Sequence, residues 1–430
     1  MSTTHAEKPL RIAIFTDDFF PKSGGVARSI ELQINELVRA GHDVTLFAPK
    51  PFFIAPDNCK SEALDVWYIP GTESFLCSLK FGRKQAEYIY DNYKYFDVIH
   101  SQNERGAMFL ACRVAQLMGV PQIHTFHSNY AATHRTSPFL SAINSLTYMN
   151  IAPLILRKLR PARSGMRIFF PRKLTAVESA PLARSDWKNV ARMARYVDAF
   201  TSPAQYVIDA IVDSSRGQLD ERAFTVGNGI SDIFAKAERI RPEEEIVRFL
   251  SCGRLDPEKR VDVIIKAFAK LNDRNSELYI LGAGAREKSL KKLAERIVKR
   301  GTVLFLGHYN DIERIANEYA NADVFVFASY RFDTQGMVLA EAAASGTPIL
   351  YCDDRLRIGV SPENALLVKP SVSALAEGMR TLVRNPELRL SMTRASKPLG
   401  KRLTAERMEQ RFLSVYAYAL KRPVSDTIES

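Results

Sequence analysis

The chain has 430 residues, of which 46% are hydrophobic and 25% charged, and its formal net charge is +12. This length exceeds one ordinary core and predicts two domains of roughly 200 residues each, while the composition excludes a low-complexity or disordered chain. The five cysteines lack CxxC spacing, no hydrophobic leader precedes the first strand, and no apolar run approaches the ~20 residues of a membrane span, so the sequence predicts a cytoplasmic protein without disulfides or zinc.

Short apolar runs alternate with helical patterns in the first half of the chain. The run at 10–16 precedes a helix with Ile30, Ile34 and Leu37 on one face, and residues 43–48 then resume as a strand. The same unit recurs within residues 97–126. This alternation predicts a parallel sheet covered by helices.

The alternation of apolar runs and helical patterns starts again after about residue 236 and continues to residue 352. The restart predicts an α/β fold of two Rossmann-like domains, residues 1–236 and 237–402, with a hinge at 235–245 and a last helix at about 403–422 that packs back on the first domain. Because ligands bind beyond the carboxyl ends of parallel strands, we expect the two domains to face each other across a cleft.

Two glycines, Gly24 and Gly25, follow the first strand and open the first helix. Glycine lets the backbone approach a ligand closely, and free amides at a helix start favour an anion. A plain tight turn explains the pair nearly as well, because neither GxGxxG nor GxxxxGK[ST] is present.

Two cations, Arg254 and Lys259, follow the first strand of the second domain. At the mouth of a sheet they could clamp a diphosphate and stabilise it as a leaving group. The alternative is a pair of surface cations bound to Asp256 and Glu258.

Two acids, Asp333 and Glu341, flank Gly336 where another helix is expected to begin, so that the amides of Met337 and Val338 would face a phosphate. Ionised carboxylates at these positions could accept hydrogen bonds from a sugar and from the diol of a ribose. Ordinary helix capping is the alternative.

The positive charge is concentrated in residues 105–177, which contain ten Arg or Lys and no Asp or Glu. Apolar clusters alternate with basic ones in its second half, a pattern that suits an anionic membrane surface. A solvated loop or a nucleic-acid patch are alternatives. The cations expected on the membrane or acceptor side are Arg157, Lys158, Arg160, Arg163, Arg167, Arg172 and Lys173, and the apolar residues expected to insert are Ile155, Leu156, Ile168, Phe169 and Phe170.

Taken together, the motifs resemble those of the retaining GT-B glycosyltransferases of family 4, a group that includes phosphatidylinositol mannosyltransferases and glucosyldiacylglycerol synthases. The resemblance runs from about residue 10 to 420 and rests on "SGGVA", "TFHS", "VGNGI", "GRLDPEKRVD", "LGAGAREKSL" and "DTQGMVLAEAAASGTPI" in family order. The first of the paired acids is usually Glu in the family and is Asp333 here.

The resemblance implies roles for these residues. It implies that Arg254 and Lys259 bind the donor diphosphate and that Glu341 binds the donor ribose. It also implies that Asp333 and the amides after Gly336 contact the transferred sugar and its phosphate. Gly25 would approach that phosphate from the other domain. His127 would contact the sugar or the reacting centre; composition alone makes it an ordinary structural histidine, but it lies at the carboxyl end of its strand, facing away from His124.

The implied reaction transfers a hexose from a UDP-sugar or GDP-mannose to a hydroxyl with retention, without a cofactor or metal ion, because cations and helix amides stabilise the leaving group. The basic segment lies in the acceptor domain and favours a membrane glycerolipid over a soluble sugar or polysaccharide precursor, with the enzyme peripheral on the inner face of the membrane. A non-hydrolysing nucleotide-sugar epimerase shares the architecture but needs further acid/base groups. A nucleic-acid-binding protein would explain only the charge, so no nucleic-acid partner is expected.

Overall fold

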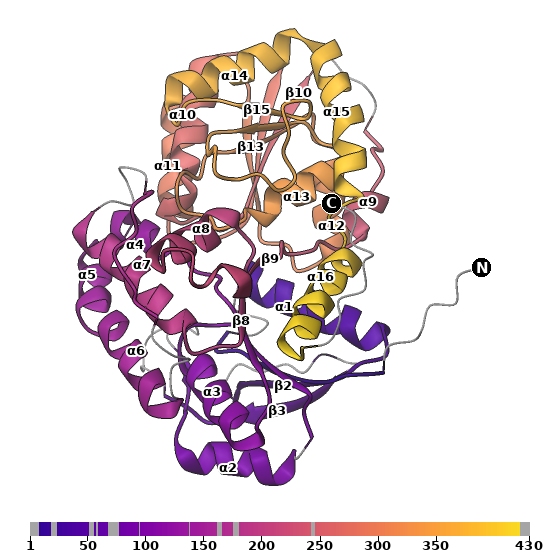
Figure 1. The fold of residues 1–430 in the computed structure, drawn as a ribbon. Coiled ribbons are helices and arrows are strands. Elements are labelled where there is room, and N and C mark those ends of the chain that lie inside the picture. Colours follow the sequence, from indigo (N-terminus) through magenta and orange to yellow (C-terminus); the bar gives the residue numbers. More distant parts are fainter. Residues whose placement is uncertain are drawn as a thin grey trace. The chain divides into compact units, whose positions relative to one another are not determined.

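The computed structural model describes residues 8–18, 24–50, 56, 59–67, 77–93, 95–136, 138–160, 166–174, 180–241 and 246–421. The chain divides into two compact units, residues 1–227 with 408–430 and residues 228–407 (Figure 1). Each unit is built on its own parallel sheet with helices packed against it, so the predicted two-domain α/β architecture is confirmed.

The sheet of the first unit has, among the described residues, seven parallel strands in the order β3-β2-β1-β6-β7-β8-β9. Every residue of β6, β7 and β8 is buried, as expected for strands covered on both faces. The strands are β1 (Arg11–Phe15), β2 (Asp43–Pro49), β3 (Lys60–Leu64), β6 (Val98–Ser101), β7 (Gln122–Thr125), β8 (Ala199–Ser202) and β9 (Ala223–Thr225). A small antiparallel pair consists of β4 (Val66–Trp67) and β5 (Ser78–Leu79).

Chain order reverses at β1, where Ile12 pairs with Val44 of β2 on one side and with Val98 of β6 on the other. At such a switch point the loops after the two central strands diverge and leave room for a ligand at their carboxyl ends. The helices of this unit are α1 (Gly25–Arg39), α2 (Arg83–Asn92), α3 (Gly106–Met118), α4 (Tyr130–Thr136), α5 (Pro138–Leu146), α6 (Tyr148–Leu159), α7 (Pro181–Ala194) and α8 (Gln205–Ser214), with a 3₁₀ turn at Asp220–Arg222.

The second unit repeats the plan with six described parallel strands in the order β12-β11-β10-β13-β14-β15, and its order reverses between β10 and β13. The strands are β10 (Val247–Cys252), β11 (Ser276–Leu281), β12 (Thr302–Gly307), β13 (Val324–Phe327), β14 (Ile349–Tyr351) and β15 (Ala365–Leu367). The helices are α9 (Ile233–Lys236), α10 (Val261–Leu271), α11 (Glu287–Ile297), α12 (Ile312–Ala320), α13 (Met337–Ala344), α14 (Val372–Arg384) and α15 (Pro386–Gly400), with a 3₁₀ turn at Pro257–Lys259.

The described part of the expected hinge, residues 235–241, is attached to the second unit. Arg239 and Arg241 each place a guanidinium nitrogen 2.8 Å from a carboxylate oxygen of Asp323, which directly precedes β13. Residues 242–245 lie outside the described residues.

The last helix, α16 (Ala405–Ala419), enters the first unit at residue 408. Its Tyr416 is fully buried, accepts a hydrogen bond from Gln33 Nε2 of α1 at 3.0 Å, and lies with its hydroxyl 2.9 Å from His100 Nδ1 of β6. This helix therefore completes the polar interior of the first unit beside β6.

Helices α5 and α6 follow each other as one helical stretch of 22 residues, Pro138–Leu159, within which an 18-residue window has a mean hydropathy of 1.4. By length and composition it could cross a membrane, which corrects the expectation that no apolar segment approaches that length. Polar residues such as Ser141, Ser145 and Asn150 interrupt its apolar runs, so a search for uninterrupted runs misses it. One such helix does not by itself indicate a span, because helices of soluble cores have the same composition.

Candidate functional site

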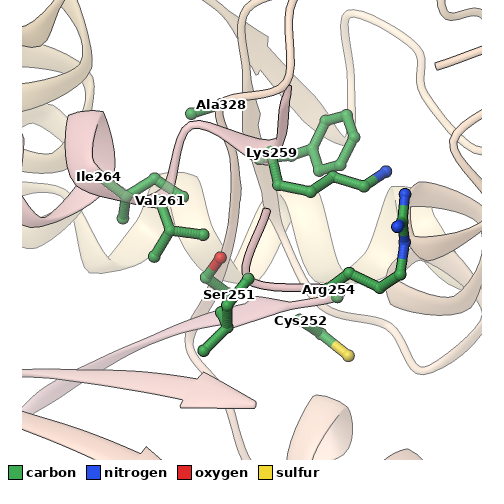
Figure 2. Close-up of a pocket in the computed structure, with 10 residues that line it drawn as sticks. Ser251, Cys252, Arg254, Lys259, Val261, Ile264 and Ala328 are labelled. Carbon is green, nitrogen blue, oxygen red and sulfur yellow. The ribbon is translucent and has the colours of Figure 1, made fainter. Parts of the chain in front are cut away.

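A pocket lies at the carboxyl end of β10, beside β13, where the second sheet reverses its chain order. It is lined by Ser251, Cys252, Gly253, Arg254, Leu255, Lys259, Val261, Ile264, Phe327 and Ala328. Figure 2 shows the Lys259 amine and the Arg254 guanidinium extending toward the same side of this pocket. The two predicted cations therefore do line a common pocket, at the place where α/β folds bind ligands.

Arg254 is the more accessible of the two, with 57% of its side chain exposed. Its guanidinium lies 2.6 Å from Asp256 Oδ2 and 2.7 Å from Glu258 Oε1. These are the partners that the surface-cation alternative names. Exposed ion pairs are worth only about 0–1 kcal/mol, so a phosphate can replace them at small cost.

Lys259 is only 19% exposed and forms an ion pair with the Asp333 carboxylate. The hydroxyl of Ser329 donates a hydrogen bond to the other oxygen of Asp333. The 3₁₀ turn before α10 carries Lys259 and the loop after β13 carries Asp333, so the fold joins two predicted site residues 74 positions apart in the chain. Lys259 and Asp333 therefore neutralise each other in this partly buried position.

Helix α13 begins at Met337, directly after Gly336, as the sequence predicts. Gly336 has φ +74°, and a Cβ there would lie 3.2 Å from Leu356 Cδ1. Only glycine adopts this conformation without strain, and it turns the chain so that the helix starts at the end of β13. The first amides of α13, at Met337 and Val338, have no partner within the helix, which suits an anion.

Glu341 lies one turn inside α13 and is buried. The hydroxyl of Tyr319, itself fully buried in α12, donates a 3.0 Å hydrogen bond to Glu341 Oε2. This contact joins α12 to α13 and helps to hold the Glu341 side chain in one orientation.

Two predicted site elements belong to the first unit. Gly24 precedes α1 and Gly25 begins it, and both are exposed. A Cβ on Gly24 would meet nothing within 4 Å, so open space lies above this helix start. The opening is compatible with a ligand, and residues 19–23 before it lie outside the described residues.

His127 follows β7 and is buried. Burial lowers its pKa to about 4, so the ring is neutral at pH 7. Its Nε2 lies 2.8 Å from Gln102 Oε1, and its backbone amide donates to Glu104 Oε1 at 3.1 Å. With Gln102 Oε1 as acceptor, Nε2 carries the proton, and the ring is held at the carboxyl edge of the sheet by the loop after β6.

A chain of hydrogen bonds leads inward from His127. Gln102 Nε2 donates to Gln33 Oε1 at 2.7 Å, and Gln33 Nε2 donates to Tyr416. Sequence reasoning missed Gln102 and Glu104, although "SQNE" directly follows the strand "DVIH". A run of polar residues at the end of a buried strand, next to the strand that carries His127, was the available signal.

Sequence reasoning also missed a pair of acids after β1. Asp17 is buried and accepts hydrogen bonds from the amides of Leu79 (2.7 Å) and Ala107 (3.0 Å), the latter in the first turn of α3. Burial raises its pKa to about 6. Asp18 forms an ion pair with Arg105 at 3.1 Å. These contacts brace the loops at the switch point of the first sheet, and the "TDD" after the first strand signalled them.

The predicted basic surface is only partly present. Arg157, Lys158, Arg167, Arg172 and Lys173 are exposed, whereas Arg163 lies outside the described residues. The prediction that Arg160 faces the membrane or acceptor is wrong, because Arg160 lies 2.9 Å from the buried carboxylate of Asp198 and stabilises the fold. Its partner is 38 residues away in the chain, so the sequence could not reveal the pair.

The apolar residues expected to insert into a membrane also need correction. Leu156 is fully buried, and Ile155 and Ile168 pack against the same core. Only Phe169 and Phe170 are exposed, and cations cover their rings: Arg216 lies over the first, at 5.0 Å from its centroid, and Lys188 over the second, at 4.4 Å.

Comparison with known proteins identifies the chemistry. The family model for Glycosyltransferase Family 4 matches residues 23–232, and that for glycosyl transferases group 1 matches residues 232–398. The chain is a glycosyltransferase with the GT-B fold. As a glycosyltransferase it transfers a sugar, which favours this activity over the epimerase alternative.

Among relatives of this glycosyltransferase, the alpha-monoglucosyldiacylglycerol synthase of Streptococcus pneumoniae is 26% identical over 361 residues, covering 79% of this chain and 70% of the relative. The enzyme of that name from Acholeplasma laidlawii is 23% identical over 94% of this chain and 97% of its own. Among solved structures, Anabaena HepE in complex with UDP and glucose superposes with a TM-score of 0.64 at 16% identity, over 94% of this chain and 98% of that one.

Proposed function

We propose that this glycosyltransferase moves a hexose from a nucleotide diphosphate sugar to a hydroxyl of a membrane glycerolipid, with retention of the anomeric configuration. The observation that carries the donor half is the pocket at the end of β10, where Arg254 and Lys259 meet next to the loop that leads to α13. A structural neighbour crystallised with UDP and glucose supports a nucleotide sugar, either a UDP-sugar or GDP-mannose.

In the proposed reaction the bond between the anomeric carbon and the diphosphate breaks, and the acceptor oxygen forms its bond on the same face. The leaving phosphate gains negative charge, which Arg254, Lys259 and the amides of Met337 and Val338 stabilise. The acceptor proton passes to an oxygen of that phosphate, so atoms and charges balance without a covalent enzyme intermediate. Neutral His127 contributes a hydrogen bond to the sugar rather than a charge.

Donor binding is proposed to rearrange the ion pair between Lys259 and Asp333. The diphosphate takes Lys259, and the released carboxylate of Asp333 accepts a sugar hydroxyl, while Glu341 accepts the ribose diol. We further propose that no metal ion takes part, because the cations already supply the charge that a metal would.

The acceptor half of the proposal is supported by the two monoglucosyldiacylglycerol synthases among the relatives, whose name refers to a glycerolipid. The exposed cations of the first unit support a peripheral place on anionic membranes. The five free cysteines are consistent with the reducing cytoplasm, so we place the enzyme on the inner face of the cell membrane.

The test incubates purified protein with a panel of UDP- and GDP-sugars, with and without anionic lipid extract, and follows release of the nucleotide diphosphate. We expect release with one donor to rise on addition of lipid, an α-configured product from an α-configured donor by NMR, and full activity in EDTA. Release stimulated only by soluble sugars would replace the lipid acceptor, inversion would refute the retaining course, and loss in EDTA restored by metal would refute metal independence.

A further inference from the structure

An exposed apolar stripe runs along α5 and α6, which lie end to end at one side of the first unit (Figure 1). Phe139, Leu140 and Leu146 are 76%, 67% and 65% exposed. At 100° per residue these positions fall on one side of the helical stretch. They share that side with three further exposed residues, Ile143, Ile151 and Leu154. We call these six residues the α5–α6 face.

The opposite side of the same helices belongs to the core of the first unit. Met149, Ala152 and Leu156 are fully buried in it. In α5 the Ser145 hydroxyl donates to the buried Asp186 of α7 at 2.7 Å. The Tyr148 hydroxyl of α6 donates to the backbone carbonyl of Glu104. Crossing a bilayer would break all of these contacts, so the face can meet a membrane only from its surface.

The charged residues of α5 and α6 themselves are all basic. Residues 105–177 contain no Asp or Glu, so no acid on α5 or α6 opposes an anionic surface. Arg157 and Lys158 are exposed in the last turn of α6, on the side that carries the apolar stripe. Large exposed apolar side chains flanked by cations and free of acids are the pattern of a helix that lies in an anionic lipid interface.

We infer that the α5–α6 face docks the protein on anionic bilayers, with its apolar residues inserted shallowly and Arg157 and Lys158 at the phosphates. This replaces the insertion residues predicted from the sequence. The inference rests on the proposed function, because it supplies the contact through which a lipid acceptor is reached, yet docking and transfer are measured separately.

The first test is sedimentation with vesicles of one-third phosphatidylglycerol in phosphatidylcholine at low salt. We expect wild-type protein in the pellet, and at least about tenfold weaker binding after Phe139→Gln, Leu140→Gln and Leu146→Gln together. Gln keeps helix propensity, and all three positions are exposed. The matched control is Ile240→Gln, Leu388→Gln and Leu390→Gln, three exposed apolar residues of the second unit, which should bind like wild type.

The second test reverses charge. Arg157→Glu with Lys158→Glu should weaken vesicle binding about thirtyfold or more, and added salt should have the same effect on wild type. Lys292→Glu with Arg296→Glu, exposed on α11, changes the net charge equally and should leave binding within about threefold of wild type.

The inference would be overturned by wild-type protein that stays in the supernatant, by face variants that bind like wild type, or by a dimer in light scattering that dissociates in the face variants. Retention in the pellet after an alkaline carbonate wash would show a span instead of docking. Turnover with a short-chain soluble acceptor separates the two proposals. If vesicle binding fails while transfer to this acceptor persists, only the docking inference is refuted. If wild-type protein transfers sugar to no acceptor, the proposed function is refuted and the result of the binding assay still stands.

Discussion

At the scale of single residues, the two cations of the β10 pocket differ in setting but are expected to act together. Arg254→Ala or Lys259→Ala should each lower kcat about a hundredfold, or about 3 kcal/mol of transition-state stabilisation, because in the proposed reaction each stabilises charge that grows as the diphosphate leaves. Initial rates of nucleotide release measure this. The control is Lys266→Ala, which removes an exposed lysine paired with Asp262 on neighbouring α10; turnover like wild type in both pocket variants would contradict the assignment.

Substitutions of the two acids around Gly336 are expected to have different effects. Glu341→Gln should chiefly weaken nucleotide binding, since the amide would lose the charge-assisted bonds to the ribose that we propose for Glu341. Asp333→Asn should lower turnover and blur the choice among donor sugars, because it also removes the partner of Lys259. Asp333→Glu, the usual family residue, should be tolerated or change donor preference. Calorimetric titration with UDP and GDP, beside donor competition assays, separates the effects; identical profiles for the two amide variants would favour a structural role.

The sequence predicted which residues lie at the pocket but not which residues they pair with. The sequence placed Arg254, Lys259 and Asp333 in loops after strands, and the structure confirms those loops. It could not show that Asp333 is the residue that neutralises Lys259, because this pairing depends on β10 and β13 being neighbours in the sheet. Arg160 was misassigned for the same reason: a charge that pairs across the fold looks identical in sequence to one that faces solvent.

At the scale of elements, the start of α13 depends on one backbone conformation. Gly336→Ala should lower the free energy of unfolding by about 1–2 kcal/mol, because a non-glycine residue at φ +74° is strained and its Cβ presses on Leu356. Urea denaturation measures the loss. Gly82→Ala, before α2 at φ −63° with nothing near its Cβ, should be neutral within about 0.5 kcal/mol.

The positions of helices and strands were predicted correctly where the apolar periodicity is strong. They were missed where polar residues interrupt the periodicity. The strand at 98–101 and the helix beginning at Met337 were predicted because apolar runs and glycine mark their limits. Helices α5 and α6 were not predicted, because Ser141, Ser145 and Thr147 break the apolar pattern. Two of those polar residues, Ser141 and Ser145, are buried, and Ser145 bonds to Asp186, which sequence alone cannot indicate.

At the scale of the whole molecule, the buried polar network of the first unit should make its stability depend on pH. Burial lowers the pKa of His127 to about 4, whereas an unfolded histidine titrates near 6.5. At pH values between about 4 and 6.5, His127 binds a proton in the unfolded chain but not in the folded protein. The contribution of His127 is therefore fully present above pH 6.5 and is lost as pH falls through about 4. Asp17 behaves oppositely: its folded pKa of about 6 exceeds the ordinary 3.8, so its contribution is present below 3.8 and is lost as pH rises through about 6.

Variants separate these opposing contributions. The stability advantage of wild type over His127→Asn should shrink by about 2 kcal/mol between pH 7.5 and pH 5.0, because one pKa unit corresponds to about 1.4 kcal/mol. The difference between wild type and Asp17→Asn should move in the other direction over the same range. Both tryptophans of the chain, Trp67 and Trp187, lie in the first unit, so their fluorescence in urea reports on the unit that holds both residues. A difference for His127→Asn that stays constant across this range would mean that the ring titrates normally and is open to water.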